Sequence, residues 1–102
     1  MGLNKQQFRF TFMVKELLDF YYKNGYNVAM GDVWSKPEYG AHSKNSKHYD
    51  KLAIDLNLFN NRGVFLTRTK DHEPGGLFWE SMGGTWGGRF EKKDGNHYSL
   101  GE

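Results

Sequence analysis

Cysteine is absent from the 102-residue sequence. Disulfide bonds and metal sites built from thiolates are therefore excluded, so any metal must be bound by histidine, aspartate or glutamate side chains. No apolar run approaches the roughly 18 residues of a membrane-spanning helix. The N-terminal segment MGLNKQQFRF also lacks the roughly 7–15 apolar residues of a secretory signal peptide. We therefore expect a protein that is made in a cytoplasm and does not insert into membranes.

The sequence also lacks a large excess of positive or negative charge. The chain carries 14 lysine and arginine residues against 12 aspartate and glutamate residues, a formal net charge of +2. This balance permits weak attraction to an anionic polymer but does not indicate nucleic acid, which we do not expect as a partner. The length indicates one domain over residues 1–102, which we expect to be monomeric. Apolar residues make up 37% of the chain, enough for a modest core whose stability a bound metal could increase.

Apolar periodicity predicts an α+β domain with an N-terminal helix packed on a mostly antiparallel sheet. The helix is expected from about residue 5 to residue 24, with Asn4 as N-cap and Gly25 as the stop. Its apolar face consists of Phe10, Val14, Leu17, Leu18 and Tyr21. Strands are expected at residues 26–33, 52–59, 64–67 and 97–100, with a polar loop at 35–47 and a turn at 60–63. A second helix is expected at residues 71–82, with Pro74 near its start.

Two segments combine a histidine with an acidic residue. In the first, His48 precedes a predicted strand in which Asp55 is surrounded by apolar residues. A carboxylate in such a strand is costly unless it pairs with a cation or binds a metal, and the pattern favours neither alternative. In the second, Asp94 lies three residues before His97 in a glycine-bordered loop. Asp94 fits a proton-accepting base in a metal site, and it also fits an ordinary turn residue before Gly95.

Several stretches resemble one family of zinc peptidases, which includes D-alanyl-D-alanine carboxypeptidases and L-alanyl-D-glutamate endopeptidases. Residues 46–56, SKHYDKLAIDL, are similar to its SxHxxGxAxDL motif. Residues 83–90, GGTWGGRF, and residues 94–98, DGNHY, resemble its GGxW and DxxH block. Residues 31–34, GDVW, and the opening helix resemble the bacteriophage branch, so the resemblance spans nearly the whole chain. It implies a fold like that of the hedgehog and D-Ala-D-Ala peptidase group.

The resemblance also implies a zinc site and the roles of its residues. His48, Asp55 and His97 would bind the zinc ion, leaving one position open for water. Asp94 would act as general base, and then as the acid that protonates the leaving amine. Ser46 occupies the position of a serine that orients a ligand or contacts substrate. The implied substrate is the peptide stem of bacterial peptidoglycan.

Two positions depart from the family pattern. Lys51 stands at the glycine of the first motif, and Ser35 stands where an arginine usually follows the tryptophan of the GDVW segment. Lys36 or Arg89 could replace that arginine as a positive charge near substrate, although lysine lacks the planar fork of a guanidinium. The expected substrate-binding residues are Ser46, Lys36, Trp86 and Arg89.

The remaining aromatic and histidine residues have more ordinary interpretations. Trp34, Trp79 and Trp86 are expected in the core or in the wall of a cleft, because aromatic side chains dominate small cores. His42 is expected to be exposed, as is His72, which lies between two acidic residues.

Three functional hypotheses follow. The leading one is a zinc peptidase of the phage endolysin kind, which reaches the cell wall through a separate membrane-permeabilising protein and cleaves either L-Ala–D-Glu or D-Ala–D-Ala bonds. The second is a cell-wall-binding module that is stabilised by metal but catalytically weak, and Ser35 in place of arginine motivates it. The third is an unrelated structural protein with scattered histidines and no metal.

Overall fold

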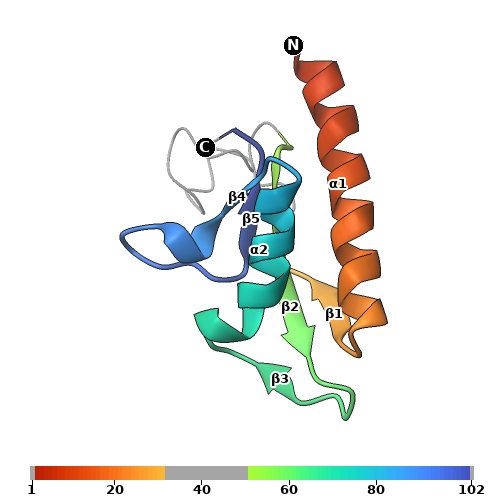
Figure 1. Ribbon diagram of the computed structural model, residues 1–102, viewed down its shortest axis with the longest axis vertical. Coiled ribbons are helices and arrows are strands. Elements are labelled where there is room, and N and C mark those ends of the chain that lie inside the picture. Colours follow the sequence, from red (N-terminus) through yellow and green to blue (C-terminus); the bar gives the residue numbers. More distant parts are fainter. Residues whose placement is uncertain (1, 32–50, 102) are drawn as a thin grey trace.

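The computed structural model describes residues 2–31 and 51–101. They form an α+β fold in which two helices accompany a five-stranded sheet (Figure 1). The sheet has the order β1-β2-β5-β4, with β3 also paired to β2, and every pairing is antiparallel. The predicted fold class is therefore confirmed. None of the helices in the described ranges is long and apolar enough to cross a membrane.

Helix α1 (Leu3–Lys23) buries one apolar face and ends at a glycine. The buried face consists of Phe10, Met13, Val14, Leu17 and Tyr21, with Leu18 partly buried against the same core. Gly25 follows the helix with φ +86°, a conformation that favours glycine, as predicted. The prediction that Asn4 is the N-cap is wrong, because Gly2 is the extended residue before the helix. The Gln6 amide donates to the Gly2 carbonyl oxygen at 3.0 Å, so the first helical turn already includes Asn4.

Strand β2 (Ala53–Phe59) is the centre of the sheet. Its C-terminal half pairs with β1 (Asn27–Met30), and its N-terminal half pairs with β5 (His97–Ser99). Two short strands complete the sheet: β3 (Phe65–Leu66) on β2 and β4 (Thr85–Trp86) on β5. The strands at residues 26–33 and 64–67 were thus predicted in the right places but too long.

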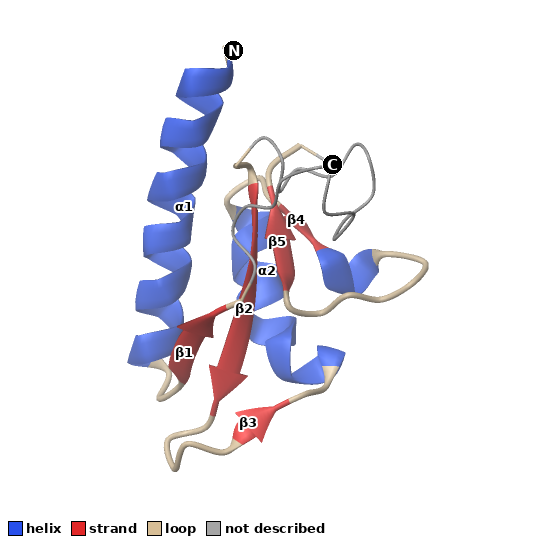
Figure 2. Cartoon of the chain, turned by 180° about the vertical axis from the view of Figure 1, so that it is seen from behind, coloured by secondary structure: helices blue, strands red, loops and turns tan. Residues whose placement is uncertain are grey.

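Helix α2 (Glu73–Ser81) follows a 3₁₀ turn, η2 (Thr69–His72), and carries Pro74 in its first turn. The ring of Phe78 on this helix stacks on Phe20 of α1 at a centroid distance of 4.7 Å. Figure 2 shows α2 behind β2 and β5, with α1 at the side of the sheet. Trp79 and Trp86 lie in the core as expected, whereas Trp34 lies outside the described residues.

Candidate metal centre

Asp55 and His97 face each other across the middle of the sheet. They are register partners on β2 and β5. The next pair along the ladder is hydrogen-bonded, because the Leu56 amide donates to the Asn96 carbonyl oxygen at 2.9 Å. Asp55 and His97 therefore form a non-hydrogen-bonded pair, the type in which opposing side chains come closest. His97 Nδ1 lies 3.5 Å from Asp55 Oδ1, and both side chains are largely buried.

Asp94 joins this pair from the turn that leads into β5. The His97 amide donates to the Asp94 carbonyl oxygen at 3.1 Å, which closes a turn over residues 94–97. The turn brings a carboxylate oxygen of Asp94 close to the other two residues. One potential ligand atom each from Asp55, Asp94 and His97 lies within 4.8 Å of the others. Asp94 is the exposed member of this group, while His97 is buried.

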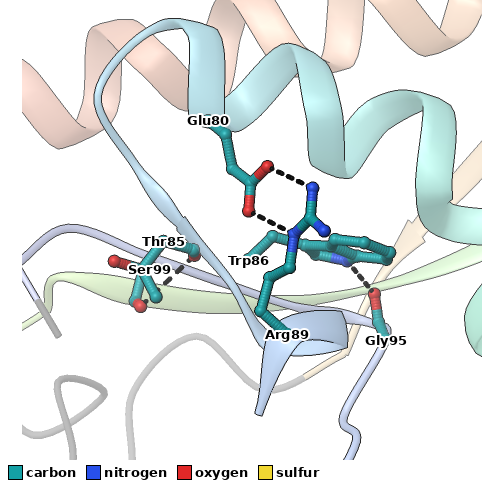
Figure 3. Close-up of polar contacts among 6 residues, drawn as sticks. All are labelled: Glu80, Thr85, Trp86, Arg89, Gly95 and Ser99. Carbon is teal, nitrogen blue, oxygen red and sulfur yellow. Dashed lines mark hydrogen bonds and ion pairs between the residues drawn. The ribbon is translucent and has the colours of Figure 1, made fainter.

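The segment after β4 holds the 94–97 turn in place. The Asp94 amide donates to the Gly87 carbonyl oxygen at 2.9 Å. A side chain at Gly87 would overlap the Asp94 carbonyl oxygen and bring a Cβ within 2.8 Å of His97 Cβ, so only glycine fits there. The indole Nε1 of Trp86 donates to the Gly95 carbonyl oxygen at 2.8 Å (Figure 3). Burial of Trp86 thus anchors the turn that carries Asp94 and His97.

The three converging residues fit a divalent cation. A tetrahedral zinc ion bonded at about 2.0–2.2 Å separates its ligand atoms by roughly 3.3–3.6 Å. The 3.5 Å between His97 Nδ1 and Asp55 Oδ1 matches that separation. Imidazole nitrogen and carboxylate oxygen are ligands that zinc accepts. A cation would also offset the repulsion between the neighbouring carboxylates of Asp55 and Asp94.

Three of the four residues predicted for the catalytic centre therefore meet, namely Asp55, Asp94 and His97. The fourth, His48, lies outside the described residues, as do the predicted substrate residues Lys36 and Ser46, and His42. The group places Asp94 beside the other two without distinguishing a ligand from a general base. The individual roles remain predictions.

Trp86 and Arg89 are the other two predicted substrate residues. They lie in or next to the segment that holds the 94–97 turn in place. Trp86 is 3% exposed. Arg89 is exposed and forms two hydrogen bonds of 3.0 Å with the Glu80 carboxylate (Figure 3). This contact raises the pKa of the guanidinium further, first through the hydrogen bond and then through the charge of Glu80. A role for either residue in substrate binding remains a prediction.

His72 was expected to be exposed, and that expectation is wrong. The residue is 4% exposed, and its Nδ1 lies 2.7 Å from the Tyr98 hydroxyl oxygen. Successive residues of a 3₁₀ turn point about 120° apart, so a residue between two acidic neighbours can still face the core. Burial lowers the pKa of His72 to about 4. It is therefore neutral at pH 7.

A cleft beside Asp94 was not foreseen from the sequence. It has a volume of about 390 Å³. Its lining residues come from β2, from β3 and the segment that joins β3 to α2, and from the 94–97 turn with the residue before it: Asn57, Phe65, Leu66, Thr67, Arg68, Thr69, His72, Lys93, Asp94, Gly95 and Asn96. No single stretch of sequence signals this cleft, because three distant segments form it.

A family model described as D-alanyl-D-alanine carboxypeptidase matches residues 39–100, which is more than half of the chain. The matched range includes both histidine-and-acid segments. None of the curated proteins matches the sequence.

Proposed function

The chain belongs to the D-alanyl-D-alanine carboxypeptidase family, and from that membership we propose that it is a zinc-dependent peptidase acting on the peptide stems of peptidoglycan. One observation carries the proposal. One potential ligand atom each from Asp55, Asp94 and His97 lies within 4.8 Å of the others, and Asp94 also lines the adjacent cleft. Such a cluster is the arrangement that metal-assisted amide hydrolysis requires.

The proposed roles follow from the surroundings of each residue. Asp55 and His97, on paired strands, would hold the metal rigidly together with His48. A zinc ion held there would supply Lewis-acid activation of water and of the scissile carbonyl. Asp94 is exposed and borders the cleft. Its carboxylate would accept the proton of the attacking water and deliver it to the leaving amine.

We further propose that the protein acts as a phage endolysin, which reaches the cell wall after release from the cytoplasm where it is made. Support for this role comes from the resemblance of residues 31–34 to the bacteriophage branch. The bond that is cleaved, L-Ala–D-Glu or D-Ala–D-Ala, would follow from the masses of the peptides released from purified cell wall.

The test is zinc-dependent digestion of purified peptidoglycan, analysed by mass spectrometry and paired with a zinc-binding titration. His97→Ala should lose both zinc binding and turnover. Asp94→Asn should lose turnover by a factor of at least about 100, which is typical of a removed general base, and should still bind zinc. Asp19→Asn, on the exposed part of α1, is the control and should behave as wild type. Full activity of His97→Ala would overturn the proposal.

A second candidate is a catalytically weak module that binds the cell wall and uses the metal for stability. It is favoured by Ser35, which stands where the family usually has an arginine. In this case wild-type protein should sediment with purified cell walls but release no peptide. Asp94→Asn should then sediment as well as wild type.

A further inference from the structure

The cleft beside the metal centre has a distinctive charge distribution. Its charged lining residues are Arg68, Lys93 and Asp94. Asp94 belongs to the metal cluster. The lining charges away from that cluster are therefore both positive, and a bound zinc ion would add to them. Such a site favours an anionic ligand group.

Lys93 is the cation best placed to receive that group. Its side chain is exposed, and it makes no hydrogen bond or ion pair with the residues that the structure describes. It directly precedes Asp94 in the chain, so its ammonium group is tied to the same turn as the proposed base. A substrate group bound by Lys93 would thus lie in the cleft that the proposed base also lines.

Arg68 is the second cation that lines the cleft, and part of its side chain already contacts Asp71. One of its guanidinium nitrogens lies 3.3 Å from Asp71 Oδ1, and its backbone amide donates to Asp71 Oδ2 at 3.0 Å. These two contacts lower the pKa of Asp71, the backbone bond most strongly. A guanidinium has five N–H donors, so the remaining ones are available to a ligand. Because Asp71 offsets part of the positive charge of Arg68, we assign Arg68 a smaller role than Lys93 in binding the anionic group.

We propose that Lys93, assisted by Arg68, binds a substrate carboxylate in this cleft and so selects peptides with a free carboxylate next to the bond that is cut. This assignment rests on the proposed function. Neutral donors from Asn57, Thr67 and Asn96 line the same cleft and can complete the hydrogen bonding of a carboxylate. Lys93 would supply a positive charge in a sequence that has Ser35 where the family usually has an arginine.

Two carboxylates of peptidoglycan stems have the required position. One is the C-terminal carboxylate of D-Ala-D-Ala, and the other is the free α-carboxylate of a γ-linked D-Glu in L-Ala-D-Glu. The experiment therefore uses four N-acetylated peptides, namely each of these two with its carboxylate either free or converted to an amide. If amidation of one peptide makes it a poorer substrate than its free form, that peptide carries the carboxylate that the cleft binds.

The variants are Lys93→Ala and Lys93→Ala with Arg68→Ala. The matched control is Lys92→Ala, which removes an adjacent exposed lysine that does not line the cleft. Wild type should prefer the free carboxylate by about 5–10-fold in kcat/KM, mainly through KM, as expected for an exposed charged hydrogen bond. Lys93→Ala should lose that preference by lowering kcat/KM for the free carboxylate alone. Lys92→Ala should retain it.

A binding measurement separates this assignment from the peptidase proposal. Titration of each peptide into zinc-loaded protein, followed by NMR of the Lys93 and Asn96 amides, should show about fivefold tighter binding of the free carboxylate. Carboxylate-dependent binding without turnover would overturn the peptidase proposal and retain the cleft assignment. The cleft assignment fails if turnover occurs without carboxylate preference, or if Lys93→Ala and Lys92→Ala have equal effects.

Discussion

Tyr21, His72 and Tyr98 form a closed hydrogen-bonded circuit in the core. Their contacts are Tyr21 Oη to the His72 carbonyl oxygen at 3.3 Å, Tyr21 Oη to Tyr98 Oη at 2.5 Å, and Tyr98 Oη to His72 Nδ1 at 2.7 Å. All three bonds can exist together in only one way, because each hydroxyl has one proton. Tyr21 donates to the carbonyl, Tyr98 donates to Tyr21, and His72 Nδ1–H donates to Tyr98.

This circuit keeps every member neutral. Burial raises the pKa of the Tyr21 and Tyr98 hydroxyls well above the usual value for tyrosine, so both remain proton donors. Burial also lowers the pKa of His72 to about 4. Neutral His72 with its proton on Nδ1 satisfies the polar groups of the circuit without placing a charge in the core.

We predict that His72 makes the protein less stable in mild acid. Unfolded His72 takes up a proton near pH 6.5, whereas folded His72 does so only near pH 4. The unfolded state therefore binds more protons between these values, and stability falls as pH falls through this window. Between pH 7 and pH 5 the loss should be about 2 kcal/mol. Urea unfolding of metal-free protein at both pH values measures it.

His72→Gln is the comparison for this prediction. It removes this titrating group while the other histidines remain. The variant's loss of unfolding free energy between pH 7 and pH 5 should therefore be smaller than that of wild type by about 2 kcal/mol. The ¹⁵N shifts of the wild-type imidazole should show a proton on Nδ1 down to pH 5. An imidazole that titrates near pH 6.5 in the folded protein would contradict the prediction.

A second residue-scale prediction concerns Gly87→Ala. The added Cβ would overlap the Asp94 carbonyl oxygen and lie 2.8 Å from His97 Cβ. The 94–97 turn must then move, so the variant should lose about 1–3 kcal/mol of stability and at least about tenfold in zinc affinity. Thermal unfolding and a zinc titration check both effects. Gly2→Ala, with nothing within 4 Å of the new Cβ, should leave zinc affinity unchanged. If Gly87→Ala binds zinc as tightly as Gly2→Ala does, the turn is not the constraint that we describe.

At the scale of elements, the long apolar patterns were predicted well. The helical spacing in residues 3–23 and the alternation in 53–59 each bury one face, and this signal is local to the element. The short strands β3 and β4 were harder to bound, because each is defined by its partner strand. The N-cap at Asn4 was mispredicted because glycine is only slightly less favourable than asparagine at that position, so the helix can begin two residues earlier, after Gly2.

For the candidate site too, one part could be predicted from the sequence and another part could not. Asp55 and His97 could be named from sequence because an acid in an apolar strand and a histidine after Asp94 match a family motif. Their proximity depends on the β2–β5 register, which no local pattern specifies. The cleft and the burial of His72 arise where β2, η2 and the 94–97 turn meet. Such convergence of distant segments has no signature in a single stretch of sequence.

Two glycines let helix α2 approach its neighbours. A Cβ at Gly75 would overlap the Tyr21 ring, and a Cβ at Gly76 would overlap the Trp86 indole. Helix propensity alone predicts that Gly76→Ala stabilises the protein by up to about 1 kcal/mol. We predict the opposite sign, a loss of about 1–3 kcal/mol from overpacking. Urea unfolding measures it, with Leu77→Ala on the exposed side of α2 as the control. Stabilisation by Gly76→Ala would show that α2 can move away from Trp86.

At the scale of the whole molecule, the candidate metal centre links segments that are far apart in the chain. β2 supplies Asp55, while the 94–97 turn and β5 supply Asp94 and His97. The opposite side of β5 supplies Tyr98, which joins α1 and η2 through the hydroxyl circuit. Strand β5 thus contributes successive residues to the two polar clusters of the fold. A change in its register would disturb both at once.

We therefore predict that zinc stabilises the folded protein as a whole. A ligand that binds only the folded state at about 100 times its Kd adds about 2.7 kcal/mol of stability. For a chain of this length that raises Tm by roughly 10 °C or more. Calorimetry of wild type with zinc and with a chelator measures the increment. His97→Ala should lose it, whereas Lys92→Ala, which leaves the cluster intact, should keep it. An equal increment in His97→Ala would mean that zinc stabilises the fold from another site, because removing one ligand of the β2–β5 pair must weaken a cation held between those strands.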